Sequence, residues 1–352
     1  FISELGKGTS ATVYKGTYKN QAVAIKVLRL PERRQYMADF KKELEVVTTI
    51  RAPNIVHFFG ATLGEPHCCM VLELCKNGDL FHLLGNKSID ITWDRVLQWI
   101  TDTVVGINTL HQWTPQIVHR DLKTLNLLAD ENFRVKVCDF GLSRFTNGEH
   151  TLTTLGRLRG TYAYTAPEVY LGKTFSTKSD VYSIGVILWE MVIRCMSGDH
   201  QRPFAEYKAM FSRPFQIIIQ AATKKRRPTI PPKTPSPVFG MIQVCWAPLP
   251  EDRPSCEQLL SMLKTIREEY ASHKQEWDNT CHDSPDVIPV LKPPPKLIKE
   301  IKAKGSKSKT NVVGKLFKRR GSKVPPKSKD KDYKDSSKDV GFRSSSETLG
   351  TS

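Results

Sequence analysis

The sequence predicts an α+β fold of two lobes, in which a small β-rich N-terminal lobe with one helix precedes a larger, mainly helical lobe. Short runs of β-prone residues, broken by turns that contain Gly or Asn, fill residues 1–28. A helical period replaces them over 31–50, and strand patterns return over 54–74. From Leu80 onward the helical period dominates, until a Lys-, Pro- and Ser-rich tail begins near residue 284.

The N-terminal lobe is predicted from five strand runs and one amphipathic helix. The strand runs are FISEL (1–5), ATVYKGTY (11–18), AVAIKVL (22–28), NIVHFFGATL (54–63) and CCMVLEL (68–74). Between the third and fourth runs, Met37, Phe40, Leu44 and Val47 recur at the spacing of one helix face, and Pro31 opens the helix.

The second lobe is predicted to be mainly helical, with a long helix over 92–113. LLAD (127–130) and VKVCDF (135–140) read as short strands on either side of a turn at Asn132. The apolar run 181–193 is too short for a membrane span and contains Glu190, which favours a buried helix. We expect regular structure to end near Tyr270.

The predicted domain organisation follows from these patterns. Residues 1–75 and 76–270 form the two lobes of one domain, and residues 271–352 form a mostly disordered tail, which has too few apolar residues to offset the chain entropy of folding. The chain begins at Phe1 within a strand pattern, so we expect it to be part of a longer protein.

The charge is unevenly distributed along the chain. Of 53 Lys/Arg and 36 Asp/Glu residues, 18 and six lie in 291–352, which places +12 of the net +17 in the tail. A globally basic nucleic-acid binder is therefore not expected, and we predict no nucleic-acid partner. The eight cysteines form no CxxC pair, which favours a reduced, cytoplasmic protein over a disulfide scaffold or zinc site.

A glycine-rich turn, GKGTSATVYKG (6–16), joins the first two strands. Gly6, Lys7 and Gly8 can bring backbone N–H groups close to phosphates, although an ordinary hairpin turn has the same composition. VAIK (23–26) on the next strand favours the nucleotide interpretation, because Lys26 can then reach the phosphates. Glu43 lies at the edge of the apolar helix face, where it can pair with Lys26.

HRDLKTLN (119–126) and DFG (139–141) are the strongest indication of chemistry. Asp121 is suited to accept a hydroxyl proton, and Lys123, two residues on, to steady a transferred phosphate. Asn126 and Asp139 offer hard oxygen ligands for Mg²⁺, with Mn²⁺ as an alternative. Together with ATP as the nucleotide, the pattern predicts phosphoryl transfer.

These motifs resemble those of eukaryotic protein kinases, within the tyrosine-kinase-like group and similar to Raf-type and mixed-lineage kinases. The resemblance runs from about residue 2 to 268. Four further landmarks appear in order: TAPE (165–168), SDVYSIGVILWE (179–190), RRPTIP (226–231) and CWAPLPEDRPS (245–255).

The resemblance implies roles for residues outside the catalytic motifs. Glu168 is expected to pair with Arg253, Asp180 to brace the HRD backbone, and Arg120 to meet a phosphate on the activation loop. It also implies an adenine pocket, for which the expected residues are Val13, Ala24, Leu128, the gatekeeper Leu72, and a hinge from Glu73 to Cys75.

The expected acceptors are Ser and Thr side chains of protein substrates in intracellular signalling. Lys123 and Thr124 differ from the Ala-Ala-Arg or Arg-Ala-Ala that tyrosine kinases generally place after HRDL, and Thr161 stands where Ser/Thr kinases use a hydroxyl. Dual-specificity or tyrosine kinase activity is the alternative. A pseudokinase scaffold is disfavoured, because it would lack one of Lys26, Asp121, Asn126 or Asp139.

Regulation is predicted on the activation segment and on the tail. The phosphorylation candidates are Thr151, Thr153, Thr154 and Thr161, although threonines are also ordinary in exposed loops. The basic run 304–331 is either a solvated tail or a hook for anionic membrane lipid, which would add a peripheral membrane position. The Raf-type resemblance suggests a kinase dimer as a further partner. Cys138 is interpreted as a small pocket residue rather than a reactive thiol.

Overall fold

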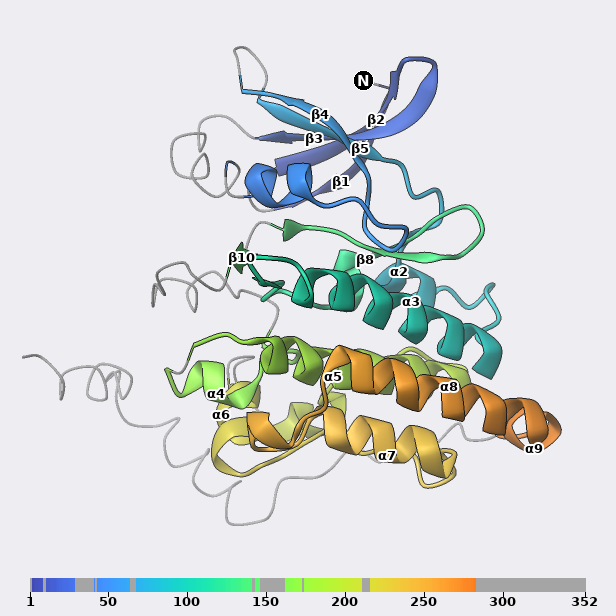
Figure 1. Ribbon diagram of the computed structural model, residues 1–352. Coiled ribbons are helices and arrows are strands. Elements are labelled where there is room, and N and C mark those ends of the chain that lie inside the picture. Colours follow the sequence, from blue (N-terminus) through green and yellow to red (C-terminus); the bar gives the residue numbers. More distant parts are fainter. Residues whose placement is uncertain are drawn as a thin grey trace, which may run out of the picture. The chain divides into compact units, whose positions relative to one another are not determined.

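The computed structural model describes residues 2–8, 11–28, 41, 43–63, 68–140, 143–145, 162–172, 174–210 and 216–282 of the 352-residue chain. An antiparallel sheet forms the N-terminal part of this region, and helices form most of the remainder (Figure 1). The predicted α+β architecture of two lobes is confirmed. The tail from residue 283 on, including the basic run 304–331, lies outside the described residues.

The sheet of the first lobe contains five strands in the order β1-β2-β3-β5-β4, with every neighbouring pair antiparallel. Its strands are β1 (Ser3–Lys7), β2 (Ala11–Tyr18), β3 (Gln21–Leu28), β4 (Phe58–Thr62) and β5 (Cys69–Glu73). Between β3 and β4, residues 43–49 are helical; we call this segment the 43–49 helix. Of the predicted helix face, Pro31, Met37 and Phe40 lie outside the described residues.

The second lobe is built from helices and two short sheets. The helices are α2 (Leu80–Gly85), α3 (Trp93–His111), α4 (Pro167–Tyr170), α5 (Thr177–Ser197), α6 (Gln216–Thr223), α7 (Ser236–Cys245), α8 (Cys256–Ser272) and α9 (Lys274–Asp278). In one short sheet, β8 (Leu127–Ala129) lies between β6 (Gly78–Asp79) and β9 (Val135–Val137); in the other, β7 (Ile117–Val118) pairs with β10 (Arg144–Phe145). The predicted helix at 92–113 and the strands around Asn132 are confirmed.

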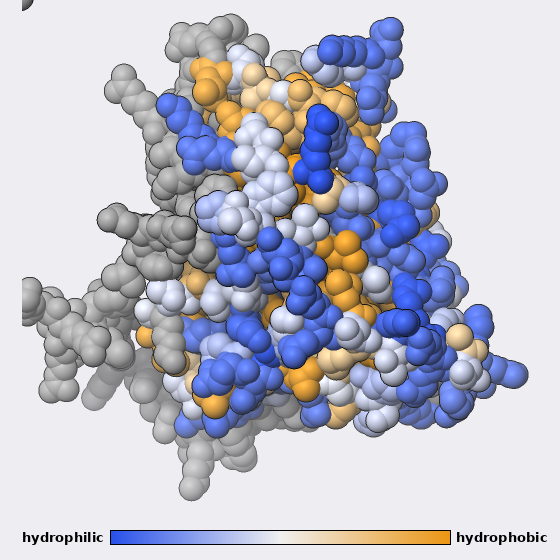
Figure 2. Space-filling model, in the orientation of Figure 1, coloured by the Kyte–Doolittle hydropathy of each residue, from blue (hydrophilic) through white to orange (hydrophobic). Residues whose placement is uncertain are grey.

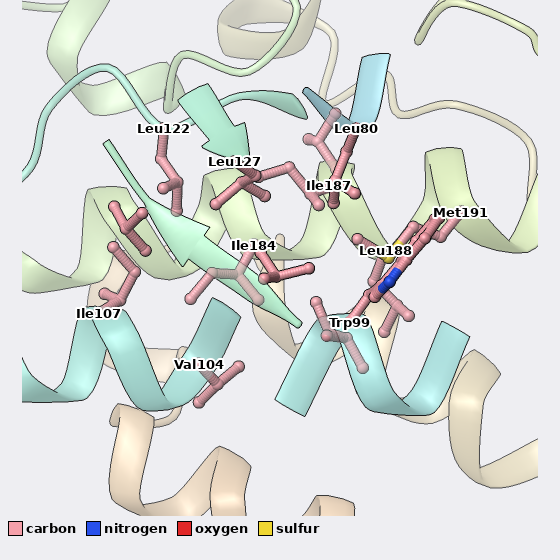
Figure 3. Packing of buried hydrophobic residues seen from close by; sticks show 14 of the residues in the cluster. Leu80, Trp99, Val104, Ile107, Leu122, Leu127, Ile184, Ile187, Leu188 and Met191 are labelled. Carbon is pink, nitrogen blue, oxygen red and sulfur yellow. The ribbon is translucent and has the colours of Figure 1, made fainter. Parts of the chain in front are cut away.

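Helix α5 is the centre of the second lobe. Every residue from Ser179 to Met196 is buried, as expected for a helix that is apolar on all sides. Helix α3 packs against both α5 and α8. In Figure 3, Trp99, Val104 and Ile107 of α3 lie in the same packed core as Ile184, Ile187, Leu188 and Met191 of α5, together with Leu80, Leu122 and Leu127. The prediction of a buried helix over 181–193 is confirmed.

Helix ends in this lobe are fixed by short polar side chains. Thr92 accepts a hydrogen bond from the Arg95 backbone at the start of α3, and Ser255 forms a capping box with Gln258 at the start of α8.

Hydrophilic residues cover most of the surface near α9 in Figure 2. Among the described residues, no helix is long and apolar enough to cross a membrane.

The prediction that regular structure ends near Tyr270 is wrong. Helix α8 continues to Ser272, and α9 follows it. Trp277 of α9 is 4% exposed and packs edge-on against Trp93, with 5.4 Å between ring centroids. The Trp93 indole N–H donates to the Thr280 hydroxyl at 2.9 Å. A single tryptophan in an otherwise polar segment thus docks the chain after α8, which no periodic pattern indicates.

Replacing Trp277 with Ala should destabilise the domain, because the change empties a buried aromatic site. The expected cost is about 3 kcal/mol, which corresponds to a melting temperature lower by about 6 °C. Differential scanning calorimetry measures the shift. Glu276→Ala on the exposed side of the same helix is the matched control. Equal melting temperatures for the two variants would show that α9 adds nothing to stability.

Candidate active site

In the glycine-rich turn between β1 and β2, the described residues leave open space beside Gly6. The Gly8 N–H donates to the Ala11 carbonyl at 2.9 Å and closes the turn. A Cβ placed on Gly6 would meet no described atom within 4 Å, so internal packing does not demand glycine there. The backbone at Gly6 therefore has room for a ligand to approach closely, which is what the predicted phosphate contact requires.

One face of the sheet gathers four of the predicted nucleotide-site residues. Val13 lies directly opposite Lys26, and Ala24 lies opposite Leu72 in the strand register. Opposite residues of antiparallel strands share a face, as do residues two apart on one strand. Val13, Ala24, Lys26 and Leu72 therefore share one face, and the register places Lys15, opposite Ala24, on that face as well.

In the predicted hinge, the side chain of Glu73 is engaged by other residues of the protein. The Glu73 carboxylate contacts Lys136 Nζ at 3.0 Å and accepts a hydrogen bond from the His57 backbone at 3.1 Å. Since its register partner is Val23 rather than Ala24, Glu73 belongs to the opposite face of the sheet from Leu72. Cys75 is buried, and burial raises the pKa of its thiol to about 12. Leu128, on β8, is half-buried.

Lys26 lies between two carboxylates that come from different parts of the chain. Its Nζ is 2.6 and 2.7 Å from the two Glu43 carboxylate oxygens, which confirms the predicted pairing with the 43–49 helix. It also donates to Asp139 Oδ1 at 3.1 Å, a contact over 113 residues that the sequence did not reveal. Lys26 therefore links the sheet, the 43–49 helix and the segment that follows β9.

The electrostatics of this triad favour the ionised forms. Burial alone would lower the pKa of Lys26, but the nearby Asp139 and Glu43 carboxylates outweigh it and raise that pKa. In turn, the charge of Lys26 lowers the pKa of Asp139 to about 2, against the opposing effect of burial. Asp139 is therefore a carboxylate at neutral pH, and 43% of its side chain stays exposed. The site thus keeps an accessible anionic oxygen donor.

Two side chains of the HRDLKTLN segment contact the carboxylate of Asp121. Lys123 Nζ lies 2.6 Å from Asp121 Oδ2, and the Asn126 amide donates to the same oxygen at 3.1 Å. The other oxygen, Asp121 Oδ1, is buried without a hydrogen-bond partner among the described residues. Because a buried carboxylate oxygen normally accepts a hydrogen bond, this atom is suited to receive one from a bound substrate.

The donor set suits a hard divalent cation. The Asn126 amide nitrogen also donates to the Asp121 carbonyl at 2.8 Å, so its orientation is fixed and the amide oxygen remains as an acceptor. The Cys138 N–H donates to the Asn126 carbonyl at 3.0 Å, which ties this loop to the residue preceding Asp139. An amide oxygen and an ionised carboxylate on such connected segments are the ligands that Mg²⁺ prefers.

Asp180, at the start of α5, holds the backbone of this loop. Its two carboxylate oxygens accept the N–H groups of His119 at 2.9 Å and Arg120 at 3.0 Å, and one also contacts His111 Nε2 at 2.9 Å. Arg120 has φ of 71°, a left-handed conformation that costs energy for a non-glycine residue. Burial alone would raise the pKa of Asp180, but its hydrogen bonds and the nearby histidines lower it. The predicted bracing role matches this geometry.

A second buried network was missed by sequence reasoning. Glu190 of α5 has no exposed surface, and it accepts from the Tyr164 hydroxyl at 2.6 Å and from Thr124 at 3.2 Å. His200 Nε2 contacts its other oxygen at 2.6 Å. The signal in the sequence was a glutamate within an otherwise apolar run, since a buried carboxylate requires partners. The network joins the HRDLKTLN segment to Tyr164, near the TAPE motif.

Glu168 and Arg253 form the expected buried pair. Two parallel hydrogen bonds of 2.6 and 2.8 Å join the guanidinium to the carboxylate. Arg253 is 1% exposed, and its remaining donors reach the Ala247 and Lys178 carbonyls. A buried pair needs such additional bonds to offset the desolvation of both charges. It fixes the TAPE segment to the loop before α8.

The predicted phosphorylation sites lie outside the part of the chain that the structure describes. They are Thr151, Thr153, Thr154 and Thr161. Arg120 is described, and its guanidinium lies 5.5 Å from the Phe175 ring centroid. Burial raises the pKa of the Cys138 thiol well above its usual range, so the reactive thiolate is disfavoured.

Comparison with known proteins places the chain among kinases. Residues 1–263 match the family described as protein tyrosine and serine/threonine kinase. The chain is 52% identical over 279 residues to stress-activated protein kinase alpha of Dictyostelium discoideum, covering 79% of this chain and 43% of that protein. It is 46% identical over 285 residues to a probable serine/threonine-protein kinase of the same organism, covering 81% and 29%.

A dual specificity protein kinase of that organism is 38% identical over 265 residues, covering 75% of this chain and 48% of that protein. The chain thus spans less than half the length of these three relatives. The match nevertheless extends over the sheet, the Lys26 triad and the Asp121 loop, and it covers well over half of the chain. The chain therefore belongs to the protein tyrosine and serine/threonine kinase family.

Proposed function

We propose that this kinase domain transfers the γ-phosphoryl group of ATP to Ser and Thr hydroxyls of protein substrates in intracellular signalling. The observation that carries the proposal is the arrangement around Lys26, which contacts Glu43 and Asp139 at once. In kinases this lysine pairs with the nucleotide phosphates and with the helix glutamate. A pseudokinase scaffold is not favoured, since Lys26, Asp121, Asn126 and Asp139 are all present.

The nucleotide would lie against the face of the sheet that bears Lys26. The backbone of Gly6, Lys7 and Gly8 would cover its phosphates. The side chains proposed to surround its base are Val13, Ala24, Leu72 and Leu128. Glu73 and Cys75 would contribute backbone groups, because the Glu73 carboxylate already contacts Lys136 and His57.

Asp121 would act as the positioned base for the acceptor hydroxyl. Its Oδ1 would accept the hydrogen bond and then the proton, while Lys123 remains beside Oδ2 and faces the charge that develops on the transferred phosphate. Asn126 and Asp139 would hold Mg²⁺, or Mn²⁺ in its place. The metal supplies neutralisation of the phosphate charge. Asp180 would keep this loop in register by holding the His119 and Arg120 N–H groups.

We propose Ser and Thr as the acceptors, the tyrosine-kinase-like group as the kinase group, and activation-loop phosphorylation as the means of regulation. Lys123 and the similarity to a probable serine/threonine-protein kinase support Ser/Thr transfer, and the TAPE and CWAPLPEDRPS landmarks motivate the tyrosine-kinase-like group. The dual specificity relative motivates the alternative. We propose that Thr153 or Thr154, once phosphorylated, pairs with Arg120. We also propose that the kinase domain forms dimers, which analytical ultracentrifugation tests. The proposed location is cytoplasmic.

Replacing Lys26 with Met should lower the rate of phosphoryl transfer by about 10²-fold or more, because the phosphates lose a preorganised cation. Glu43→Gln should have a smaller effect, since Lys26 keeps its contact with Asp139. Steady-state assays with radiolabelled ATP, Mg²⁺ and a generic basic protein measure both rates. Lys19→Met, at an exposed position in the same lobe, is the matched control. Full activity of Lys26→Met would exclude the proposed phosphate contact.

Replacing Asp121 with Asn should lower the rate by about 10²–10⁴-fold, the range for loss of a positioned base. Asp94→Asn on the exposed side of α3 is the control and should retain activity. Phosphoamino-acid analysis of the wild-type product should show phosphoserine and phosphothreonine. Phosphotyrosine in comparable amounts would favour the dual-specificity alternative, and an inactive wild-type chain would favour the scaffold.

We further propose that the basic run 304–331 attaches the kinase reversibly to anionic lipid, which would add a peripheral membrane position. Its 11 Lys/Arg residues are accompanied by one acidic residue and by Val312, Val313, Leu316 and Phe317. About 1 kcal/mol per basic residue gives about 6–8 kcal/mol for six to eight engaged side chains, which approaches micromolar binding.

The full chain should therefore sediment with phosphatidylserine vesicles and remain in solution with phosphatidylcholine vesicles. Changing Lys315, Lys318, Arg319 and Arg320 to Gln should weaken sedimentation strongly, and raised salt should do the same. Equal sedimentation with both kinds of vesicle would contradict lipid recognition by charge.

A further inference from the structure

Two thiols far apart in sequence lie in contact in the second lobe. Cys195, near the C-terminal end of α5, and Cys281, after α9, have their Sγ atoms 3.4 Å apart across 86 residues. Both are free cysteines. Neither belongs to the proposed active site.

The backbone around this pair is fixed independently of the two sulfurs. The His282 N–H donates to the Cys195 carbonyl at 3.2 Å, and the Cys281 N–H donates to the Asp278 carbonyl at 3.0 Å. Trp277 anchors the same segment against Trp93. Since a disulfide has a sulfur–sulfur distance of about 2.05 Å, the sulfurs need to approach by about 1.4 Å, which is within reach of side-chain rotation.

The two thiols differ in exposure and in acidity. Cys195 is fully buried, and burial raises the pKa of its thiol well above the usual range. Cys281 is partly exposed, and its hydrogen bond with Cys195 lowers the pKa of its thiol. Cys281 is therefore the more acidic and the more accessible of the two thiols, and Cys195, whose sulfur is in contact with it, is positioned to resolve its oxidised form.

We propose that Cys195 and Cys281 are a modification site that forms a reversible disulfide when the protein meets a peroxide. The Cys281 thiolate attacks one oxygen of hydrogen peroxide, the O–O bond breaks, and a sulfenic acid forms as hydroxide leaves and is protonated to water. The Cys195 sulfur then attacks the Cys281 sulfur. The S–O bond breaks, and the departing hydroxide takes the Cys195 proton as a second water. Two thiols are oxidised by two electrons, and one peroxide is reduced.

The disulfide would clamp the chain after α8 onto α5. Helix α5 also bears Asp180 and Glu190, so the clamp would join the helix that organises the active-site loop to the segment that leads into the basic tail. The restraint acts on the unfolded chain as well, because closing a long loop removes much of its freedom. A reducing compartment would keep the pair as thiols until an oxidant arrives.

Peptide mapping of the oxidised full chain tests the bond directly. The protein is treated with hydrogen peroxide, remaining thiols are alkylated, and the chain is digested with trypsin, which does not cleave before proline. The expected product is peptide 195–208 joined to peptide 275–296, lighter than the two peptides by two hydrogen atoms. Dithiothreitol should separate them. Detection of Cys281 only as sulfinic acid, or joined to a different cysteine, would overturn the proposal.

A stability measurement with variants gives a second, independent readout. Oxidation should raise the melting temperature of the wild-type chain by at least about 3 °C. Cys281→Ser, at the partly exposed position, should fold but lose both the shift and the linked peptide. Cys69→Ser on β5 removes a thiol from the other lobe and should keep both. A shift that persists in Cys281→Ser, or that is missing in wild type, would contradict the clamp.

Discussion

The carboxylate of Asp180 is the constraint on which the geometry of the active-site loop depends. It lies at the start of α5, the most buried helix, and it accepts the two backbone N–H groups that begin the HRDLKTLN segment. One of these belongs to Arg120, whose left-handed backbone would be costly without such support. Since α5 is surrounded by the core, these two hydrogen bonds tie the loop that carries Asp121 to that core.

The sequence predicted the parts of the fold that depend on local periodicity. The strands, the long helix α3 and the buried helix α5 each have a clear pattern, and Glu43 was placed correctly because it borders an apolar stripe. Contacts set by lobe packing were not predictable in the same way. The 113-residue contact between Lys26 and Asp139 and the partners of Glu190 arise only once distant segments are packed together. Helix α9 was missed because one tryptophan docks an otherwise polar segment.

Resemblance to a family supplied roles that spacing alone could not, and the structure refines two of them. The Glu168–Arg253 pair is present as implied, with additional carbonyl partners that complete the guanidinium. Glu73, expected to belong to the hinge, directs its carboxylate to Lys136 and His57. The register explains this: Glu73 follows Leu72, the expected gatekeeper, on β5, so it belongs to the other face of the sheet.

Lys26 shares its single positive charge between two carboxylates. Glu43 lies on the 43–49 helix beside the sheet, and Asp139 lies on the segment after β9. Withdrawal of either one leaves the ammonium with a single partner and changes the local field. The full set of contacts around the Lys26 ammonium exists only when both carboxylates are in place. A displacement of either carboxylate would therefore change the environment of the same Nζ atom.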